Sequence, residues 1–364
     1  MGSEPRIRKV DFTVCTVPTD APEADGTFEW KSTTLILAEL FSEHATGIGY
    51  TYGSEAIESL AQHLAATCLV GQSPLDIPGL NSRMARAVRN NGNGGISSMA
   101  ISMLDIALWD LKARLLGCSV SKLLGRARDE VPVYGSGGFT SYSDEQLQEQ
   151  LSAWARSGIR MMKIKVGADP GADPARVKTA RAAIGKDAGL FVDANGAYAV
   201  KQALRLAEAF HEQHVEWFEE PVSSDLVDSL RFIRERVAAG MEIAAGEYGY
   251  TAFDFWRLLK SGAVDVLQAD ATRCGGFSGF LAASRIAASL GCPLSAHCAP
   301  SLHMHVGCAP VNFRHLEYFH DHVRIERMLF DGFIEQRNGF MRPDESAPGL
   351  GLTLKRKDAL RYAA

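Results

Sequence analysis

The chain has 364 residues, of which 46% are hydrophobic and 22% are charged, and its formal net charge at pH 7 is −5. This composition is typical of a soluble globular protein with a large core, and the slightly acidic balance disfavours nucleic acid as a partner. No apolar run approaches the roughly 20 residues that a membrane-spanning helix needs, so we expect no membrane association.

The seven cysteines are scattered along the chain, and no Cys-x-x-Cys pair occurs. Neither a zinc ribbon nor a redox pair is therefore indicated. We expect free, buried thiols in a reducing compartment, which favours a cytoplasmic location.

The N-terminal part is predicted to contain β-strands followed by helices. Residues 33–42 (TTLILAELFS) are strand-like, and the glycines that follow suggest a β-meander that continues to Tyr52. Helical periodicity covers 56–67 and 98–117, and a glycine ends the second helix. We assign this part to a first domain, residues 1–128.

From residue 129 onward, short apolar or β-branched segments alternate with amphipathic stretches. The predicted strands are 131–136, 161–166, 189–195, 215–221, 242–247, 264–270, 292–297 and 314–319. Eight strands alternating with helices favour a parallel (β/α) barrel over an open sheet. We therefore predict an α/β fold with a modified TIM-like barrel at 129–340, followed by a segment, 341–364, that packs back on the N-terminal part.

An ionisable residue ends nearly every predicted strand of this barrel. The residues are Lys165, Asp193, Glu219, Glu247, Asp270, His297 and Glu317, and each lies about one βα unit after the previous one. The C-terminal ends of barrel strands form one face, where active sites lie. The sequence therefore predicts that these side chains converge at one mouth of the barrel.

Three carboxylates, Asp193, Glu219 and Glu247, end consecutive strands. Clustered carboxylates repel each other unless a cation compensates them, and an all-oxygen site suits Mg²⁺ first and Mn²⁺ second. Single carboxylates past a strand are often helix caps or ion-pair partners, but three in register favour a metal site. Either Glu219 or Glu220 could face inward, and Asn195 could bind a ligand or serve an ordinary turn.

Lys163 and Lys165 point to the same side of their strand, because side chains alternate along a strand. Two neighbouring ammonium groups destabilise each other, so one amine could become neutral and act as a base. The alternative is a pair of lysines that reach solvent or pair with acids of the barrel. A metal site beside them would hold a negatively charged substrate near these amines.

His297 and Asp270 end neighbouring strands, so the carboxylate can fix the imidazole tautomer and raise its basicity. The other histidines of this region, His303, His305, His315, His320 and His322, are expected to be structural. Glu317 would be a hydrogen-bond donor if burial kept it protonated. Together these groups suit abstraction of a proton next to a carboxylate, with stabilisation of an enediolate.

The same residues resemble the enolase superfamily, and within it the mandelate racemase subgroup, over almost the whole chain. The motifs are KIK (163–165), DAN (193–195), EEP (219–221), AGE (245–247), the Asp270 and His297 pair, LEY with Glu317, and ALWDLKARLLGCSVSKLLG (107–125). Members of this superfamily use a Lys or His base together with Mg²⁺, and the resemblance implies the same combination for this chain.

The resemblance implies an assignment for each of these residues. Asp193, Glu219 and Glu247 would bind Mg²⁺, and Lys165 and the His297–Asp270 pair would be the two bases. Lys163 would lie near the substrate carboxylate, and Glu317 would contact that carboxylate or its developing enediolate. An α+β capping domain would close the barrel mouth with loops at 17–30, which include Trp30, and at 50–53; Ser136, at the end of the first barrel strand, would also touch substrate. A small-molecule carboxylate and a symmetric homo-oligomer are the implied partners.

The reaction stays open at this point. Dehydration of a sugar acid (aldonate or aldarate) to a 2-keto-3-deoxy acid is favoured, because Thr19, Asp20, Glu23, Asp25 and Trp30 suit a hydroxylated substrate; these residues could equally be loop surface. Racemisation or epimerisation of a 2-hydroxy acid by two bases is the second reading. A catalytically silent barrel that binds ligands or serves as a scaffold is the third.

Overall fold

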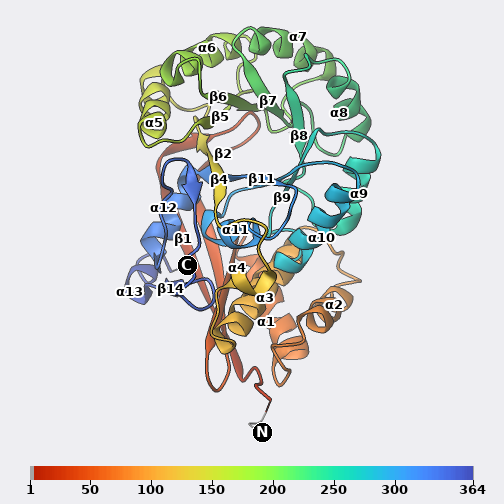
Figure 1. Cartoon of the computed structure of the whole chain (residues 1–364), viewed down its shortest axis with the longest axis vertical. Coiled ribbons are helices and arrows are strands. Elements are labelled where there is room, and N and C mark those ends of the chain that lie inside the picture. The colour runs from red at the N-terminus through yellow and green to blue at the C-terminus, as the bar shows by residue number, and fades with distance from the viewer. Residues whose placement is uncertain (1–3, 364) are drawn as a thin grey trace.

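A closed barrel of eight parallel strands forms the larger part of the protein (Figure 1). The computed structural model describes residues 4–363. The barrel strands are β4 (Val131–Gly137), β5 (Met161–Lys165), β6 (Gly189–Asp193), β7 (Val215–Glu219), β8 (Glu242–Ala245), β9 (Val266–Ala269), β10 (Leu294–Ala296) and β11 (Phe313–Phe319). They follow each other in sequence order, and pairing of β11 with β4 closes the barrel. The predicted (β/α) barrel is confirmed.

Helices cover the outside of the barrel (Figure 1). They are α5 (Asp144–Arg156), α6 (Asp173–Ile184), α7 (Val200–His211), α8 (Val227–Arg234), α9 (Ala252–Lys260), α10 (Gly276–Ser289), α11 (Pro300–Val306) and α12 (His320–Leu329). In α7 the buried residues are Ala203, Leu206, Ala207 and Phe210. This spacing of three and four residues gives one apolar face toward the strands.

The interior of the barrel has an aromatic layer below a layer of ionisable residues. Tyr134, Phe191 and Trp217 are buried and contact each other with ring centroids 5.3 to 6.3 Å apart. Two residues further along the same strands, side chains point to the same side again. The alternation therefore places Ser136, Asp193 and Glu219 directly above the aromatic layer, at the mouth.

The N-terminal domain is a three-stranded antiparallel sheet with helices packed on it. Its elements are β1 (Lys9–Ala24), β2 (Glu29–Phe41), β3 (Thr46–Tyr52), α1 (Ala56–Leu64), the π-helical turn η1 (Ala65–Leu69), α2 (Ile77–Ala87), α3 (Ile96–Leu115) and α4 (Val120–Leu124). The predicted loop at 17–30 was therefore largely wrong, since it consists of the ends of β1 and β2 joined by a turn. Pro18 and Pro22 obscure this strand in the sequence, but β1 is an edge strand, where proline is tolerated.

This β1–β2 turn lies on the mouth of the barrel. A Cβ atom on Gly26 would be 2.6 Å from the carbonyl oxygens of both Val166 and Ala194, which follow β5 and β6. Only glycine permits this close approach. The strand β3 is attached to the barrel too, because Thr51 donates a hydrogen bond to the carbonyl of Thr272 at 2.8 Å. The capping domain is thus fixed over the strand ends.

The C-terminal segment joins the two parts. It contains β12 (Phe330–Asp331), β13 (Phe340–Met341), β14 (Thr353–Leu354) and α13 (Arg356–Ala359). Strand β13 pairs with β4, whereas Thr16 of β1 donates to the carbonyl of Tyr362 at 2.8 Å, so the chain ends beside the capping domain (Figure 1). The predicted architecture is confirmed, and we propose the domain boundaries 1–128, 129–340 and 341–364.

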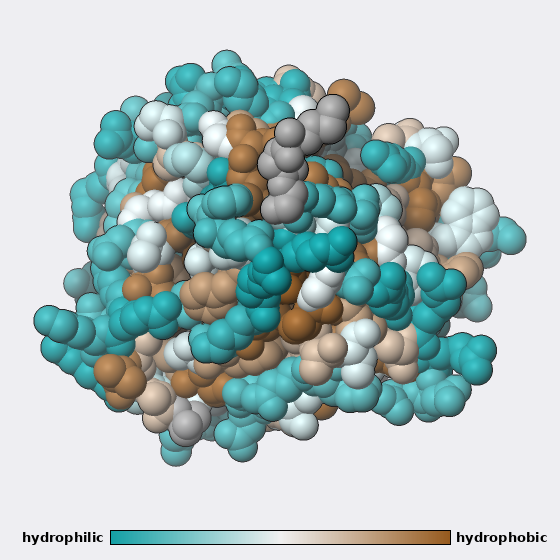
Figure 2. All heavy atoms as spheres, turned by 90° about the horizontal axis from the view of Figure 1, so that it is seen from below, coloured by the Kyte–Doolittle hydropathy of each residue, from teal (hydrophilic) through white to brown (hydrophobic). Residues whose placement is uncertain are grey.

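The surface at the end of the molecule that carries the capping domain is mostly hydrophilic, with apolar side chains interspersed (Figure 2). Among residues 4–363, no helix combines the length and the apolar character needed to cross a membrane.

Candidate active site

A cavity of about 530 Å³ lies between the barrel mouth and the capping domain. From the barrel it is lined by Lys165, Asn195, Glu247, Asp270, His297 and Glu317, and from the capping domain by Asp25, Trp30, Thr33 and Tyr52. Its volume lies within the range of small-molecule sites. Five of the seven predicted strand-end residues therefore face one cavity.

The three predicted metal ligands meet at one end of this site. Each of Asp193, Glu219 and Glu247 offers a carboxylate oxygen, and these oxygens all lie within 4.8 Å of one another. All three residues are buried, and Glu247 Oε2 accepts no hydrogen bond from the described residues. Burial and the charge of Asp193 raise the pKa of Glu219. Clustered, buried oxygens of this kind fit a hard divalent cation such as Mg²⁺.

The neighbouring Glu220 is oriented differently. Its backbone has a positive φ of 37°, and its side chain lines a second cavity together with Ser223. Glu219 is thus the member of the EEP motif that belongs to the carboxylate cluster, as the family resemblance implied.

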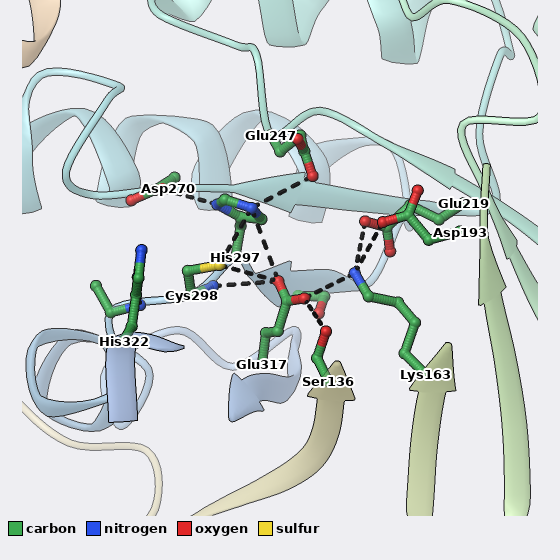
Figure 3. Close-up of polar contacts among 12 residues, drawn as sticks. Ser136, Lys163, Asp193, Glu219, Glu247, Asp270, His297, Cys298, Glu317 and His322 are labelled. Atoms are coloured by element: carbon green, nitrogen blue, oxygen red, sulfur yellow. Dashed lines mark hydrogen bonds and ion pairs between the residues drawn. The ribbon is translucent and has the colours of Figure 1, made fainter. Parts of the chain in front are cut away.

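Both lysines of the KIK motif point into the barrel mouth. Lys163 Nζ lies 2.7 Å from Glu219 Oε1, 2.8 Å from Glu317 Oε1 and 3.3 Å from Asp193 Oδ2 (Figure 3). Lys165 Nζ lies 2.6 Å from Asp193 Oδ2 and donates to Asn195 Oδ1 at 2.9 Å. The two lysines share one side of the strand, as predicted. They also pair with acids of the barrel, which was the alternative given for them from the sequence.

The two lysines were expected to lower each other's pKa, but neighbouring carboxylates outweigh this effect in the structure. Burial and Lys163 act to lower the pKa of Lys165, but the Asp193 carboxylate overcomes them, so that the pKa is raised. The pKa of Lys163 is raised as well, because Glu219 and Glu317 overcome burial. The neighbouring carboxylates therefore determine the charge of both lysines. The spacing of the lysines in the sequence does not reveal these carboxylates.

His297 and Asp270 form the predicted pair. His297 Nδ1 and Asp270 Oδ2 are 2.8 Å apart, and the other ring nitrogen lies 3.3 Å from Glu247 Oε2 (Figure 3). Burial acts to raise the pKa of Asp270, but its hydrogen bond with His297 lowers it overall. An ionised Asp270 holds the proton of His297 on Nδ1, so Nε2 is the nitrogen available toward the cavity.

Glu317 differs from the neutral acid expected from the sequence. Its Oε1 accepts a hydrogen bond from Ser136 at 2.6 Å, and its Oε2 accepts one from the backbone N–H of Cys298 at 3.2 Å. Burial acts to raise its pKa, but Lys163 overcomes burial and lowers it. Glu317 is therefore an ionised acceptor here, and the condition for acting as a donor, a protonated carboxyl group, is not met.

The residues predicted to bind substrate fall into two groups. Trp30, Asn195 and Glu317 line the cavity, whereas Lys163 and Ser136 are fully buried behind Glu317 and do not line it. The Trp30 indole donates to Glu23 Oε2 at 2.8 Å, so its ring presents an apolar face to the cavity. Ser136 positions Glu317 in this structure, and direct contact of Ser136 with substrate is not supported.

Tyr52, which belongs to the predicted capping turn at 50–53, also lines the cavity, whereas Arg273, Cys298 and His322 line it and were missed from the sequence. Arg273 lies 3.8 Å from Glu247 and 3.7 Å from Asp270, so its position three residues after a strand-end acid could have indicated it. His322 was expected to be structural. Its place on α12, beyond the last barrel strand, carries no signal in the sequence.

The comparisons with known proteins cover the whole chain. The mandelate racemase / muconate lactonizing enzyme N-terminal domain matches residues 11–125, and the enolase C-terminal domain-like family matches residues 146–359. The chain is 33% identical to L-talarate/galactarate dehydratase of Salmonella typhimurium over 362 residues, covering 96% of this chain and 89% of that protein.

Solved structures agree with this assignment. A mandelate racemase/muconate lactonizing enzyme-like protein from Rubrobacter xylanophilus is 50% identical, with a TM-score of 0.97, over 99% of this chain and 100% of that one. L-Talarate dehydratase from Polaromonas sp. JS666, crystallised with Mg and L-glucarate, is 32% identical, with a TM-score of 0.89, over 99% of this chain and 98% of that one. The chain belongs to the enolase superfamily, in its mandelate racemase / muconate lactonizing enzyme subgroup, and is an enzyme of the hydro-lyase or isomerase type.

Proposed function

We propose that this enzyme removes the proton next to the carboxylate of a sugar acid and eliminates a hydroxyl group from the adjoining carbon. The product would be a 2-keto-3-deoxy acid. The observation that carries the proposal is a single cavity that is lined by Lys165 and His297 from the barrel and by several hydroxyl side chains from the capping domain. The relatives that act on galactarate and talarate, or bind glucarate, support the same substrate class.

We propose Asp193, Glu219 and Glu247 as the residues that would hold Mg²⁺. When bound there, the ion would act as a Lewis acid toward the substrate carboxylate and stabilise the negative charge that develops as the proton leaves. The close approach of these three buried carboxylates supports this assignment, because clustered negative charges are costly unless a cation compensates them.

Lys165 is the proposed base for the α-proton. Its ammonium group is slightly exposed to the cavity, whereas Lys163 is completely buried. Asp193 and Asn195 hold the Nζ atom in place at 2.6 and 2.9 Å, which fixes the direction of proton transfer. Abstraction requires the neutral amine, so the base acts after Lys165 has given up its proton.

His297 is the proposed acid that delivers a proton to the departing hydroxyl. Asp270 holds Nδ1 at 2.8 Å, and Nε2 lies within 3.3 Å of Glu247 and 3.2 Å of the Cys298 thiol. Both ring nitrogens therefore have polar neighbours, and a proton carried on Nε2 can be released toward the cavity.

The capping-domain side of the cavity favours a substrate with several hydroxyl groups. Ser32, Thr33, Thr34 and Ser54 of the capping domain line it, together with the rings of Trp30 and Tyr52. Hydroxyl side chains can both donate and accept, which suits a polyol better than an aromatic tail. Of the loop residues expected to contact substrate, Asp25 and Trp30 line the cavity, while Asp20 pairs with His320 outside it.

The test is a screen of aldonic and aldaric acids with Mg²⁺, in which the 2-keto product is measured with and without a chelator. A chelator-insensitive formation of product would contradict the proposed metal site. The positions of Lys165 on β5 and His297 after β10, on different sides of the barrel mouth, also suit a two-base racemase. Incubation in D₂O distinguishes the two, since a racemase would exchange the α-proton of both configurations without forming a keto acid.

A further inference from the structure

The backbone after β10 has an uncommon conformation at two successive residues. Cys298 and Ala299 have positive φ angles of 52° and 40°, which few non-glycine residues adopt. As a result, two consecutive N–H groups point to neighbouring side chains. The N–H of Cys298 donates to Glu317 Oε2, and the N–H of Ala299 donates to His322 Nδ1, both at 3.2 Å.

The second of these hydrogen bonds fixes the tautomer of His322. A backbone N–H can only donate, so Nδ1 of His322 accepts and carries no proton. Burial, with a smaller effect of His297, lowers the pKa of His322 to about 3, and the ring is neutral. A neutral imidazole without a proton on Nδ1 carries it on Nε2, which is therefore a fixed donor.

The ring of His322 is also held in place. Tyr52 stacks on it with centroids 3.5 Å apart and an angle of 15° between the planes, and Phe319 packs edge-on at 5.2 Å. The Tyr52 hydroxyl in turn lies 3.4 Å from Glu326 Oε1. The donor direction is thus set by packing before any ligand enters.

No group among residues 4–363 accepts a hydrogen bond from Nε2 of His322, although the side chain is only 8% exposed and lines the cavity. Such a donor is unfavourable unless a ligand supplies the acceptor. His322 lies on the far side of Glu317 from Lys163 (Figure 3). It therefore faces the part of the cavity away from the lysines.

We propose that His322 is a specificity-determining residue that donates a hydrogen bond from Nε2 to an oxygen on the substrate tail, beyond the carbon that loses its proton. The inference rests on the proposed function, because it takes the ligand to be a hydroxylated acid. A substrate that lacks an oxygen at this place leaves the donor unpaired. Sites of this kind reject deoxy analogues more strongly than apolar pockets do.

The first experiment needs no substrate. Long-range ¹H–¹⁵N NMR spectra of the Mg²⁺-loaded, ¹⁵N-histidine-labelled protein should show the His322 ring with its proton on Nε2 at pH 7, with assignment by comparison with H322F. A ring protonated on Nδ1 would overturn the inference. Addition of a bound sugar acid should shift the Nε2 signal.

The second experiment compares an accepted acid sugar with its monodeoxy analogues in H322F, H322Q and the matched control H320Q. His320 lies two residues earlier and pairs with Asp20 outside the cavity. Wild type and H320Q should prefer the hydroxylated substrate by about 10- to 100-fold in kcat/KM at one carbon. H322F should bring this ratio close to one, while H322Q, whose amide nitrogen can replace Nε2, should restore part of it.

An unchanged ratio in a folded H322F would overturn the inference. If no acid sugar reacts, the proposed function fails. The role of His322 is then tested separately by the binding of sugar acids in the presence of Mg²⁺. Sugar acids that bind with Mg²⁺ and shift the Nε2 signal would then support the role of His322. Sugar acids that bind without any effect on that signal, or that do not bind, would overturn it.

Discussion

Replacement of Lys163 by methionine tests the charge balance at the barrel mouth. The ammonium group is fully buried and has carboxylate oxygens of Glu219, Glu317 and Asp193 at 2.7, 2.8 and 3.3 Å. Methionine keeps most of the side-chain volume but leaves these carboxylates without their shared cation. Removal of one partner of a buried ion pair costs about 3 to 5 kcal/mol, because the remaining charge is uncompensated.

The expected change in melting temperature follows from this cost. A chain of this size loses roughly 2 °C per kcal/mol, so Lys163→Met should melt about 6 to 10 °C lower than wild type in a chelator. A divalent cation at the same carboxylates would replace part of the missing charge. Because wild type also binds the ion, a larger response of the variant requires tighter binding, and each tenfold decrease in Kd adds about 1.4 kcal/mol of stabilisation at saturating Mg²⁺.

The assay is differential scanning calorimetry of wild type, Lys163→Met and Lys201→Met, each with chelator and with Mg²⁺. Lys201 lies exposed on α7 and is the matched control, which should melt like wild type. The upward shift caused by Mg²⁺ should be several degrees larger for Lys163→Met than for the other two proteins. Equal shifts in all three would refute the idea that Lys163 and the cation neutralise the same carboxylates.

Three further predictions concern the proposed acid, the capping domain and the loop that carries a metal ligand. Asp270→Asn should lower the kcat of dehydration about 10²- to 10⁴-fold, since the tautomer of the His297 ring is no longer held; an unchanged kcat would exclude this role. Burial, assisted by a nearby aspartate, raises the pKa of Glu23 from 4.5 to about 9, so the folded protein keeps a proton that the unfolded chain releases. Stability linked to that proton is lost as the pH rises through this window, and the melting temperature of Glu23→Gln should therefore fall less between pH 6 and 9 than that of wild type. In Gly246→Ala the new Cβ would lie 2.2 Å from a backbone oxygen at a φ of 133°, with an expected cost of more than about 2 kcal/mol and a weaker response to Mg²⁺ in thermal shift. Gly240→Ala, where no atom lies within 4 Å, should behave like wild type.

The barrel could be predicted because its signal is local. Each strand is a short apolar segment, and the period of two along β5 places Lys163 and Lys165 on one side. Strand β1 was not predicted, and Pro18 and Pro22 interrupt the pattern in its second half. Its pairing with β2, which continues after a register shift between Pro18 and Glu23, depends on a partner strand and an edge position that no local pattern contains.

The order of the residues along the chain was enough to determine which acids and bases end neighbouring strands, since parallel strands in a barrel meet at one face. The charge of these groups was decided only by the tertiary structure. Lys163 and Glu317, 2.8 Å apart although 154 positions separate them in the chain, each shift the other toward its ionised form. Electrostatic energies depend on distance and burial, so the ionised Glu317 and the fixed donor on His322 exist only once the fold has brought β5, β10, β11 and α12 together.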